Sequence, residues 1–220
     1  MGGPVTRIKI CGITREEDAL AALGLGVHAL GFIFVPESPR AVTPARAAEI
    51  LQTPGLLCWR VAVVRRLDSA TLAALPRGFD AVQYYEPGDA ARAGAGLRRI
   101  RALRVRGPES LREAAAAQED ADMILLDAWH PHKLGGSGEA FDWQVAREAR
   151  QHLRVPLVLA GGLGPENVEQ ALEAVRPFAV DVSSGVEAAP GRKDHSRLRA
   201  FVEAVRRFDA REASRRHEPA

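Results

Sequence analysis

Short apolar runs and amphipathic stretches follow one another in regular order along almost the whole chain. The apolar runs are rich in Val, Ile, Leu and Ala, and they predict β-strands. The eight predicted strands are Val5–Cys11, Ala29–Phe34, Leu57–Val64, Ala81–Tyr84, Arg99–Val105, Met123–Asp127, Leu157–Ala160 and Ala179–Ser183. Helical periodicity predicts the segments between and after them: Arg15–Leu25, Pro44–Leu51, Ser69–Leu75, Asp89–Ala93, Pro108–Gln118, Asp142–Gln151, Pro165–Val175 and Asp194–Phe208.

Three of these predicted helices carry a recognisable start signal. Thr14 is followed three residues later by Glu17, the spacing of a capping box. Thr43–Pro44 places a capping residue before a proline at the first helical position, and Gly164–Pro165 has a similar arrangement. We therefore expect helices to begin just after each of these pairs.

Alternating strands and helices are typical of a parallel sheet. Runs such as "LLCWRVAVV" and "PLVLA" are apolar nearly throughout, as expected for strands covered on both faces. Eight such units within 220 residues predict a single-domain α/β fold, a (β/α)8 TIM barrel over residues 1–208. A doubly wound open sheet is the alternative, although it usually has fewer strands at this length. The polar segment 209–220 is expected to fray.

Composition excludes several classes of function. The net charge is +2 and no basic run is interleaved with aromatic residues, so we expect no nucleic-acid partner. The sequence has no stretch of about 18 apolar residues that could span a membrane, and we expect no signal peptide. The two cysteines are Cys11 and Cys58. A cytoplasmic protein without disulfides is the simplest interpretation, with a bond between these two as the alternative.

Glycine pairs follow the last two predicted strands. Gly161 and Gly162 end the seventh, and Ser184 and Gly185 end the eighth. Glycines let backbone N–H groups surround an anion, and these two loops form a recurrent phosphate site in TIM barrels. A tight turn explains either pair alone, but together they predict a phosphate site.

Asp127 ends an apolar run at the sixth predicted strand and is either a helix cap, an ion-pair partner or a catalytic carboxylate. The segment Ala128–Phe141 that follows contains "GGSG" and is interpreted either as a lid or as a sharp connection. Trp129 in this segment is a candidate to cover a ligand. His130 and His132 lack an obvious third ligand, so we predict no metal.

Arg40 follows the second predicted strand, and its planar guanidinium suits a carboxylate or phosphate on a ligand. A surface arginine is an equally good interpretation from this residue alone. Cys58, Trp59 and Trp143 are interpreted as packing residues.

Six motifs in register resemble one enzyme family, the phosphoribosylanthranilate isomerases of tryptophan biosynthesis. They are "KICGITREEDALAA", "GFIFVPESPRAV", "LLDAW", "GGSGEAFDW", "LAGGLGPENV" and "DVSSGVEAAPGRKD", which run from Lys9 to near Phe201. The resemblance implies a cofactor-free barrel, monomeric or homodimeric, that acts on a small phosphorylated substrate. The reaction would be an Amadori rearrangement of N-(5-phosphoribosyl)anthranilate to 1-(2-carboxyphenylamino)-1-deoxyribulose 5-phosphate.

The resemblance also assigns roles. Cys11 matches the general base and Asp127 the general acid, while Arg40 matches the arginine that faces the anthranilate. The resemblance places Asp181 and Ser183 near the reacting sugar, and it matches Gly161, Gly162, Ser184 and Gly185 to the phosphate cradle. Gln83 and Tyr85 are further candidates to bind the substrate, because they are polar residues at the end of the fourth predicted strand. An acid opens the sugar ring and a base removes the C2′ proton, so Asp127 must start protonated and Cys11 ionised. An unperturbed thiol with a pKa of about 8.5 is only about 3% ionised at neutral pH.

Side chains alternate across a strand, so Lys9 shares the inward face with Cys11, and Ile8 and Ile10 face the helices. We hypothesise that Lys9 favours the Cys11 thiolate while it pairs with an acid such as Asp181. Neutralising a buried carboxylate is the alternative role.

Two positions depart from the family pattern. Tyr85 stands where an inward histidine is usual, and Arg66 stands where the third strand usually ends in asparagine. Two rival functions fit a similar barrel: a non-catalytic phosphate-binding regulator and the aminoaldose isomerase of histidine biosynthesis. Cys11, Arg40 and Asp127 argue against the regulator, and a cysteine in place of an aspartate argues against the second isomerase.

Overall fold

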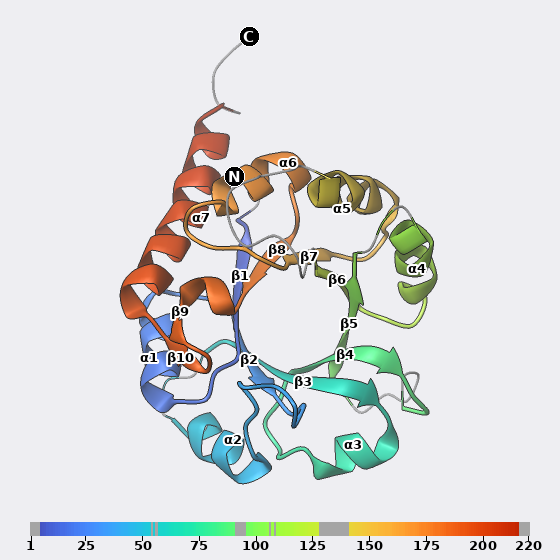
Figure 1. Cartoon of the computed structure of the whole chain (residues 1–220), viewed down its shortest axis with the longest axis vertical. Helices are drawn as coiled ribbons and strands as arrows, with labels where there is room; N and C mark the ends of the chain where they lie inside the picture. Colours follow the sequence, from blue (N-terminus) through green and yellow to red (C-terminus); the bar gives the residue numbers. More distant parts are fainter. Residues whose placement is uncertain are drawn as a thin grey trace.

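The eight predicted strands close into one parallel barrel, in the order in which they occur along the chain (Figure 1). The computed structural model describes residues 5–53, 55, 57–90, 96–105, 107, 109–127 and 141–215. The barrel strands are β1 (Arg7–Cys11), β2 (Ala29–Ile33), β3 (Trp59–Leu67), β4 (Ala81–Pro87), β5 (Arg98–Arg104), β6 (Met123–Asp127), β7 (Leu157–Ala160) and β8 (Ala179–Val182). The TIM-barrel prediction is thus confirmed, and the open sheet is excluded because β1 pairs with β8.

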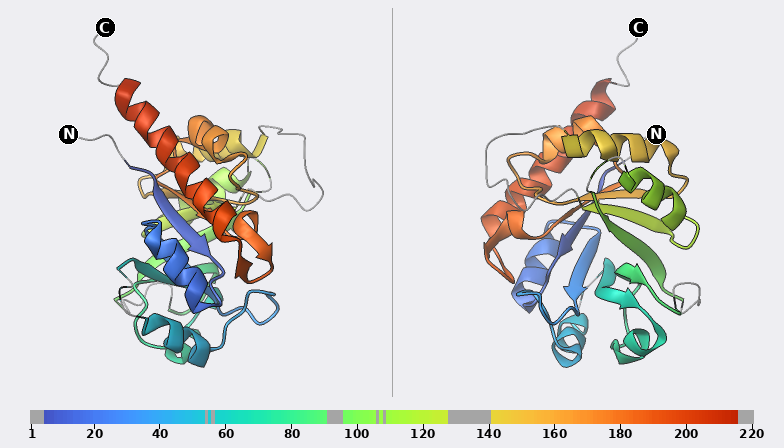
Figure 2. Two further views of the ribbon diagram at one scale, coloured as in Figure 1. Left: turned by 90° about the vertical axis from the view of Figure 1, so that its left-hand side faces the viewer. Right: turned by 45° about the vertical axis from the view of Figure 1, so that its right-hand side comes forward.

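Helices surround the barrel on its outside (Figures 1 and 2). They are α1 (Glu16–Gly24), α2 (Pro44–Leu51), α3 (Ser69–Ala74), α4 (Glu109–Ala117), α5 (Phe141–His152), α6 (Val168–Val175) and α7 (His195–Arg215). After β8 the chain also forms a short 3-10 helix, η1 (Ser184–Val186), and an antiparallel hairpin of β9 (Glu187–Ala189) and β10 (Arg192–Lys193). Sequence analysis missed this hairpin.

The alternation of side chains across each strand divides the core into two parts. Inward residues such as Val61, Ala81 and Leu125 pack together inside the barrel. Outward residues, Ile8 and Ile10 among them, pack in the same cluster as residues of the surrounding helices. The prediction that Ile8 and Ile10 face the helices is therefore confirmed. None of the described helices is long and apolar enough to cross a membrane.

Several helix boundaries differ from the predicted ones. Thr43 accepts the Arg46 N–H at 3.1 Å, as predicted for its cap. Thr14 does not cap α1, because its hydroxyl donates to the carbonyl of Gly191 instead. Gly164–Pro165 lies in a turn, and Asn167 is the residue that precedes α6.

Two further expectations concern residues near the edges of the described ranges. The helix predicted over Asp89–Ala93 begins as a turn at residues 89–90, and the rest lies outside the described residues. The helix predicted to end at Phe208 continues to Arg215, so the first part of the expected frayed tail is helical. Asp209, in this part, accepts hydrogen bonds from the backbone N–H and the hydroxyl of Thr6 at 2.9 and 2.7 Å.

Among the predicted packing residues, Trp143 is partly buried against the outer core, as expected. Trp59 is 39% exposed, so the expectation that it packs in the interior was wrong: it is the first residue of β3, at the end of the barrel where the strands begin. Cys58 is only half-buried. Both cysteines are free, which excludes the alternative disulfide.

Candidate active site

The predicted site residues come from strand ends on one side of the barrel. Cys11 ends β1, Asp127 ends β6, and Asp181 lies one residue before the end of β8. Because all strands of a parallel barrel end at the same rim, these side chains lie toward that rim, and Tyr85 of β4 lies near them. Gln83 lies on the same strand, two residues before Tyr85, and is buried. Burial raises the pKa of Tyr85 to about 12, and the charges of Asp127 and Cys11 add to the rise. Tyr85 therefore lies within electrostatic reach of both residues.

Lys9 and Asp181 form a buried ion pair one layer below the rim. The ammonium of Lys9 donates to Oδ2 of Asp181 at 2.9 Å, and both side chains are less than a tenth exposed. Their strands are neighbours in register, with Lys9 directly opposite Asp181. The predicted pair is thus confirmed. Oδ1 of Asp181 is buried and makes no hydrogen bond to any described residue.

Gly31 on β2 creates the space that this arrangement needs. A Cβ at Gly31 would lie 3.0 Å from Sγ of Cys11 and 3.1 Å from Nζ of Lys9. Contacts that short force a neighbour to move, so only glycine leaves room here for the thiol and the ammonium together. Both groups accordingly lie against the same small area of the barrel wall.

The charge of Cys11 depends on opposing influences. Burial raises the pKa of the thiol, and the nearby ammonium groups of Lys9 and Lys193 act in the opposite direction. Lys9 itself stays protonated: burial lowers its pKa, but Asp181 and Cys11 more than offset this, and the net shift is upward. Burial outweighs the two ammonium groups, so the net effect of these surroundings is to raise the pKa of the Cys11 thiol.

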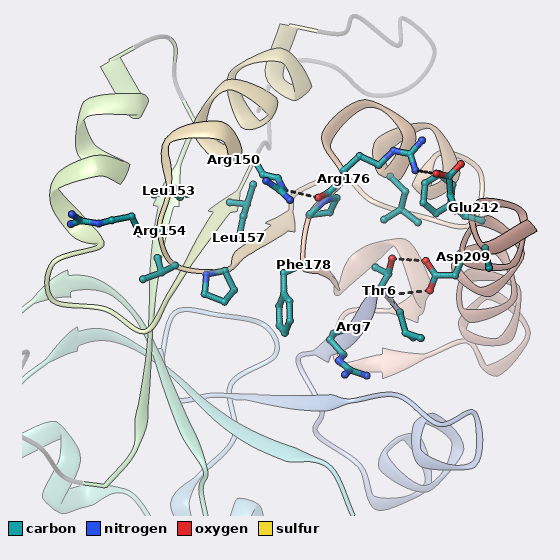
Figure 3. A pocket seen from close by; sticks show the side chains of 17 residues that line it. Thr6, Arg7, Arg150, Leu153, Arg154, Leu157, Arg176, Phe178, Asp209 and Glu212 are labelled. Atoms are coloured by element: carbon teal, nitrogen blue, oxygen red, sulfur yellow. Dashed lines mark hydrogen bonds and ion pairs between the residues drawn. The ribbon is translucent and has the colours of Figure 1, made fainter. Parts of the chain in front are cut away.

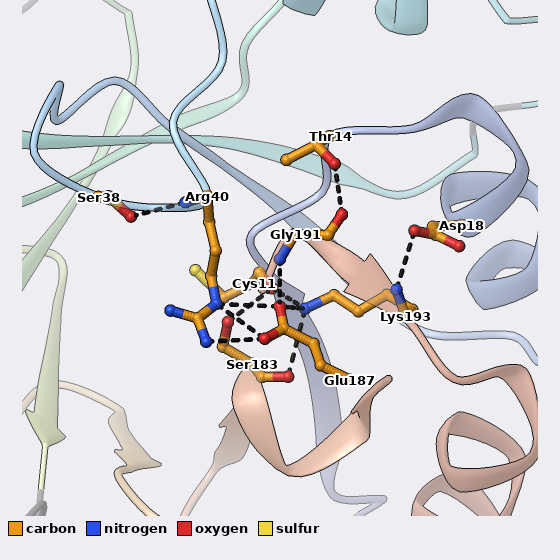
Figure 4. A network of polar contacts seen from close by, with 9 residues as sticks. All are labelled: Cys11, Thr14, Asp18, Ser38, Arg40, Ser183, Glu187, Gly191 and Lys193. Carbon is orange, nitrogen blue, oxygen red and sulfur yellow. Dashed lines mark hydrogen bonds and ion pairs between the residues drawn. The ribbon is translucent and has the colours of Figure 1, made fainter. Parts of the chain in front are cut away.

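Arg40 is held over the rim by its own partner, Glu187 of β9 (Figure 4). Nε of Arg40 donates to Oε1 and Oε2 of Glu187 at 2.9 and 3.0 Å, and Nη2 donates to Oε2 at 2.7 Å. Gly12 adopts a positive φ of 77°, and a Cβ there would lie 2.8 Å from Cδ of Arg40. The guanidinium is thus fixed by a carboxylate, and its stem lies across a residue without a side chain.

Lys193 of β10 joins the same network from the other side (Figure 4). Its ammonium donates to the carbonyl oxygens of Cys11 and Ser183 at 2.6 and 3.3 Å, and to Oε1 of Glu187 at 2.9 Å. Ser183 also donates its hydroxyl to the Cys11 carbonyl at 3.1 Å. The ends of β1 and β8 are therefore joined by a fully buried cation.

The two glycine loops lie side by side after β7 and β8. A Cβ at Gly185 would lie 1.9 Å from the carbonyl oxygen of Leu163, so the loops pack backbone against backbone. Gly161 and Gly162 have positive φ angles of 91° and 62°, and a Cβ at Gly162 would meet nothing within 4 Å. Gly162 therefore borders open space.

Asn167 holds the loop after β7 in place by two hydrogen bonds. Its Nδ2 donates to the Gly162 carbonyl at 2.9 Å, and its Oδ1 accepts the Gly164 N–H at the same distance. Within the described residues, the N–H groups of Gly162, Ser184 and Gly185 donate to no protein acceptor. The loops thus present unpaired donors near open space, an arrangement suited to an oxyanion.

Known proteins resemble this chain over most of its length. The family model described as N-(5'phosphoribosyl)anthranilate (PRA) isomerase matches residues 8–204. The chain belongs to this family. An N-(5'-phosphoribosyl)anthranilate isomerase of Geobacter sp. (strain M21) is 46% identical over 207 residues, covering 93% of this chain and all of the relative.

Solved structures agree with the family assignment. The phosphoribosylanthranilate isomerase of Thermotoga maritima has a TM-score of 0.82 and 38% identity, covering 92% of this chain and 99% of that one. A second structure contains reduced 1-(o-carboxyphenylamino)-1-deoxyribulose 5-phosphate, with a TM-score of 0.75, 35% identity and the same coverage. As a member of the isomerase family, the chain is an aldose–ketose isomerase of tryptophan biosynthesis.

The two departures from the isomerase pattern differ in position. Tyr85 lies at the rim, among the candidate catalytic groups. Arg66 does not, because it is exposed on the outward face of β3 and forms a 3.8 Å ion pair with Asp68. The substitution at Arg66 therefore leaves the candidate site unchanged, whereas Tyr85 is part of it.

Other predictions fall outside this site or outside the described residues. Trp129, His130, His132 and the lid predicted over Ala128–Phe141 belong to residues that the structure does not describe, apart from the helical backbone at Phe141. In the described ranges no group of three or more His, Cys, Asp or Glu residues is arranged to hold a metal ion. Glu187, Lys193, Gly31 and Asn167 were missed by sequence analysis.

A hollow of about 710 Å³ lies at the opposite end of the barrel, where the strands begin (Figure 3). It is lined by the beginnings of β1, β7 and β8 and by the last turns of α7, with Thr6, Phe178 and Asp209 on its walls. None of the predicted site residues lines it.

Proposed function

We propose that this isomerase acts on N-(5-phosphoribosyl)anthranilate with Asp127 as general acid and Cys11 as general base. β1 and β6 lie on different sides of the barrel, separated by β7 and β8, so the two groups approach a bound sugar from different sides (Figure 1). Asp127 would protonate the ring oxygen to open the furanose to a Schiff base. Cys11 would then remove the C2′ proton, and the enolamine would tautomerise to the ketone.

The observation that best supports Cys11 as the base is its place against Lys9 and Gly31. A buried thiol with a high pKa is a strong base once ionised, and an adjacent ammonium reduces the free-energy cost of that ionisation. The Lys9–Asp181 pair fixes the ammonium, and Oδ1 of Asp181 remains available to a substrate hydroxyl. Two free thiols also fit the predicted cytoplasmic location.

The other contacts of the substrate follow from its charges. Arg40 suits the anthranilate carboxylate, because its guanidinium is oriented at the rim. The loops with Gly161, Gly162, Ser184 and Gly185 suit the phosphate. Gln83 is 2% exposed and its Oε1 has no hydrogen-bond partner among the described residues, so it is a candidate acceptor for a sugar hydroxyl. Tyr85, two residues further along β4, and Ser183, just after β8, are further candidates for contacts with the sugar.

The decay of the fluorescence of freshly made phosphoribosylanthranilate tests this assignment. We expect turnover by the wild type and a loss of about 10²- to 10⁴-fold in kcat for Cys11→Ala and for Asp127→Asn. Cys58→Ala is the matched control, because this second thiol lies outside the site. No turnover by the wild type would defeat the proposed function, and full activity of Cys11→Ala would remove the thiol as base.

A further inference from the structure

The hairpin of β9 and β10 carries two buried charged residues, Glu187 and Lys193, whose side chains are 4% and 0% exposed. We propose that they are positioning residues of the reaction: Glu187 orients Arg40 toward the substrate's carboxylate, and Lys193 fixes the backbone that carries Cys11. The proposal deepens the proposed function and rests on it. A purely structural role, in which both residues only hold the hairpin closed, is the competing explanation.

Glu187 controls the direction of the Arg40 guanidinium. Both carboxylate oxygens bind it, through Nε and Nη2, which leaves the edge of the fork with Nη1 pointing away from Glu187 (Figure 4). Nη1 donates no hydrogen bond to the described part of the chain. Arginine forks bind carboxylates in a fixed plane, so holding one edge with Glu187 determines where the other edge can bind a ligand.

The stem of Arg40 is restrained as well as its head. Its backbone N–H donates to Oγ of Ser38 at 3.2 Å, and its side chain crosses Gly12, immediately after Cys11. The Gly191 N–H donates to Oε1 of Glu187 at 3.3 Å, which restrains the carboxylate in turn. The guanidinium of Arg40 is therefore fixed relative to the end of β1.

Lys193 fixes the backbone that carries Cys11. Its ammonium binds the carbonyls of Cys11 and Ser183, so it holds the ends of β1 and β8 together at the point where the thiol is placed. Its backbone N–H donates to Oδ2 of Asp18 at 3.0 Å, which anchors β10 to α1. A shift of Lys193 would thus move the base relative to its substrate.

The charges of the network favour an anionic ligand. One carboxylate, Glu187, is shared by two cations, Arg40 and Lys193, so the group carries an excess positive charge. Lys9 and Asp181 neutralise each other below it. Positive charge that is oriented but incompletely neutralised at the rim fits a ligand that carries both a carboxylate and a phosphate.

Two probe ligands and two substitutions of Glu187 distinguish a positioning role of this residue from a purely structural one. The probes are reduced 1-(o-carboxyphenylamino)-1-deoxyribulose 5-phosphate and the same compound without the carboxyl group, measured by calorimetry. We expect Glu187→Gln to weaken binding of the carboxylated probe roughly tenfold and to leave the other nearly unchanged. Glu187→Asp keeps the charge but shortens the side chain, so its affinity for the carboxylated probe should lie between those of the wild type and Glu187→Gln. It replaces Glu187→Gln in the test if that variant does not fold.

The control is Glu119→Gln, which removes an exposed carboxylate paired with Arg154 away from the rim. It should change neither affinity. Equal weakening of both probes by Glu187→Gln, or no weakening, would overturn the positioning role. Because this comparison measures binding, its failure is distinct from failure of the proposed function, which is judged by the turnover of the wild type and of the Cys11 and Asp127 variants.

Lys193 is tested by kinetics. We expect Lys193→Met to lower kcat roughly tenfold with little change in KM, since the base is displaced while the ligand contacts remain. Lys193→Gln keeps a donor and should recover part of kcat, and it serves as the test if the methionine variant does not fold. An unchanged kcat in Lys193→Met would overturn the positioning role. The role would also be overturned if Lys193→Met and Lys193→Gln lost the same fraction of kcat and the same amount of stability.

Discussion

At the scale of single residues, the site depends on a balance around one sulfur atom. Burial of Cys11 stabilises the neutral thiol, and the ammonium of Lys9 stabilises the thiolate. Both influences exist because Gly31 has no side chain, since a Cβ would contact both Sγ of Cys11 and Nζ of Lys9. A base of this kind becomes more effective as the pH rises toward the pKa of the thiol.

The first prediction concerns Lys9. Since its positive charge lowers the pKa of Cys11, Lys9→Met should raise that pKa further, and alkylation of Cys11 by iodoacetamide should become slower at neutral pH. The measurement is the rate of alkylation against pH, made in a Cys58→Ser background so that a single thiol reports. Cys58 requires removal because burial raises its pKa to about 11, within the range to be scanned.

The same experiment needs a variant that balances the buried charges. Lys9→Met leaves Asp181 without its cation, which is strongly destabilising in a buried pair. The double variant Lys9→Met with Asp181→Asn removes both charges, and we expect its Cys11 pKa to lie below that of the single variant, because Asp181 raises it. A midpoint of alkylation that is the same in wild type and Lys9→Met would show that Lys9 only neutralises Asp181.

At the scale of secondary-structure elements, two short connections complete the site. The hairpin of β9 and β10 holds Arg40, and the turn before α6 holds the loop that follows β7. Asn167 is the residue on which that turn depends, since its amide binds the chain on both sides of Leu163. An amide is needed because one group must donate and the other accept.

The second prediction therefore concerns Asn167. Asn167→Asp keeps the acceptor for the Gly164 N–H but loses the donor to the Gly162 carbonyl, and should raise KM about fivefold with kcat nearly unchanged. The inhibition constant of inorganic phosphate should rise by a similar factor. Gln144→Ala is the control, because its amide makes only an exposed 3.5 Å contact with Glu148. A lower melting temperature with unchanged phosphate inhibition would contradict a role in the phosphate loop.

The elements themselves were largely predictable from the sequence. Strands buried on both faces leave continuous apolar runs, and their ends locate Cys11, Asp127 and Asp181. The hairpin of β9 and β10 was missed because its two strands are only 3 and 2 residues long and have no apolar run. The Arg40–Glu187 contact was missed because its partners are 147 residues apart and no local pattern connects them. Thr14 matched a local pattern, but a tertiary hydrogen bond to Gly191 prevailed.

At the scale of the whole molecule, the barrel separates chemistry from stability. The candidate site occupies the rim where the strands end, whereas the opposite rim holds the contacts of the last turns of α7 (Figure 3). α7 is anchored near both of its ends. Nε2 of His195 lies 2.8 Å from Oδ1 of Asp18, and Asp209 accepts two hydrogen bonds from Thr6. α7 thereby holds α1 through Asp18 and holds Thr6, the residue just before β1.

The last prediction separates these two ends of the barrel. Asp209→Ala removes both acceptors of Thr6, a residue only 8% exposed, and leaves its backbone N–H without a partner. We expect the free energy of unfolding in urea to fall by about 1–3 kcal/mol. kcat and KM should stay at wild-type values under native conditions, because none of the site residues lines this end. Glu203→Ala, an exposed position on the same helix, should change stability by no more than about 0.5 kcal/mol. Equal stability of Asp209→Ala and Glu203→Ala would mean that the last turns of α7 contribute nothing, as a frayed tail would.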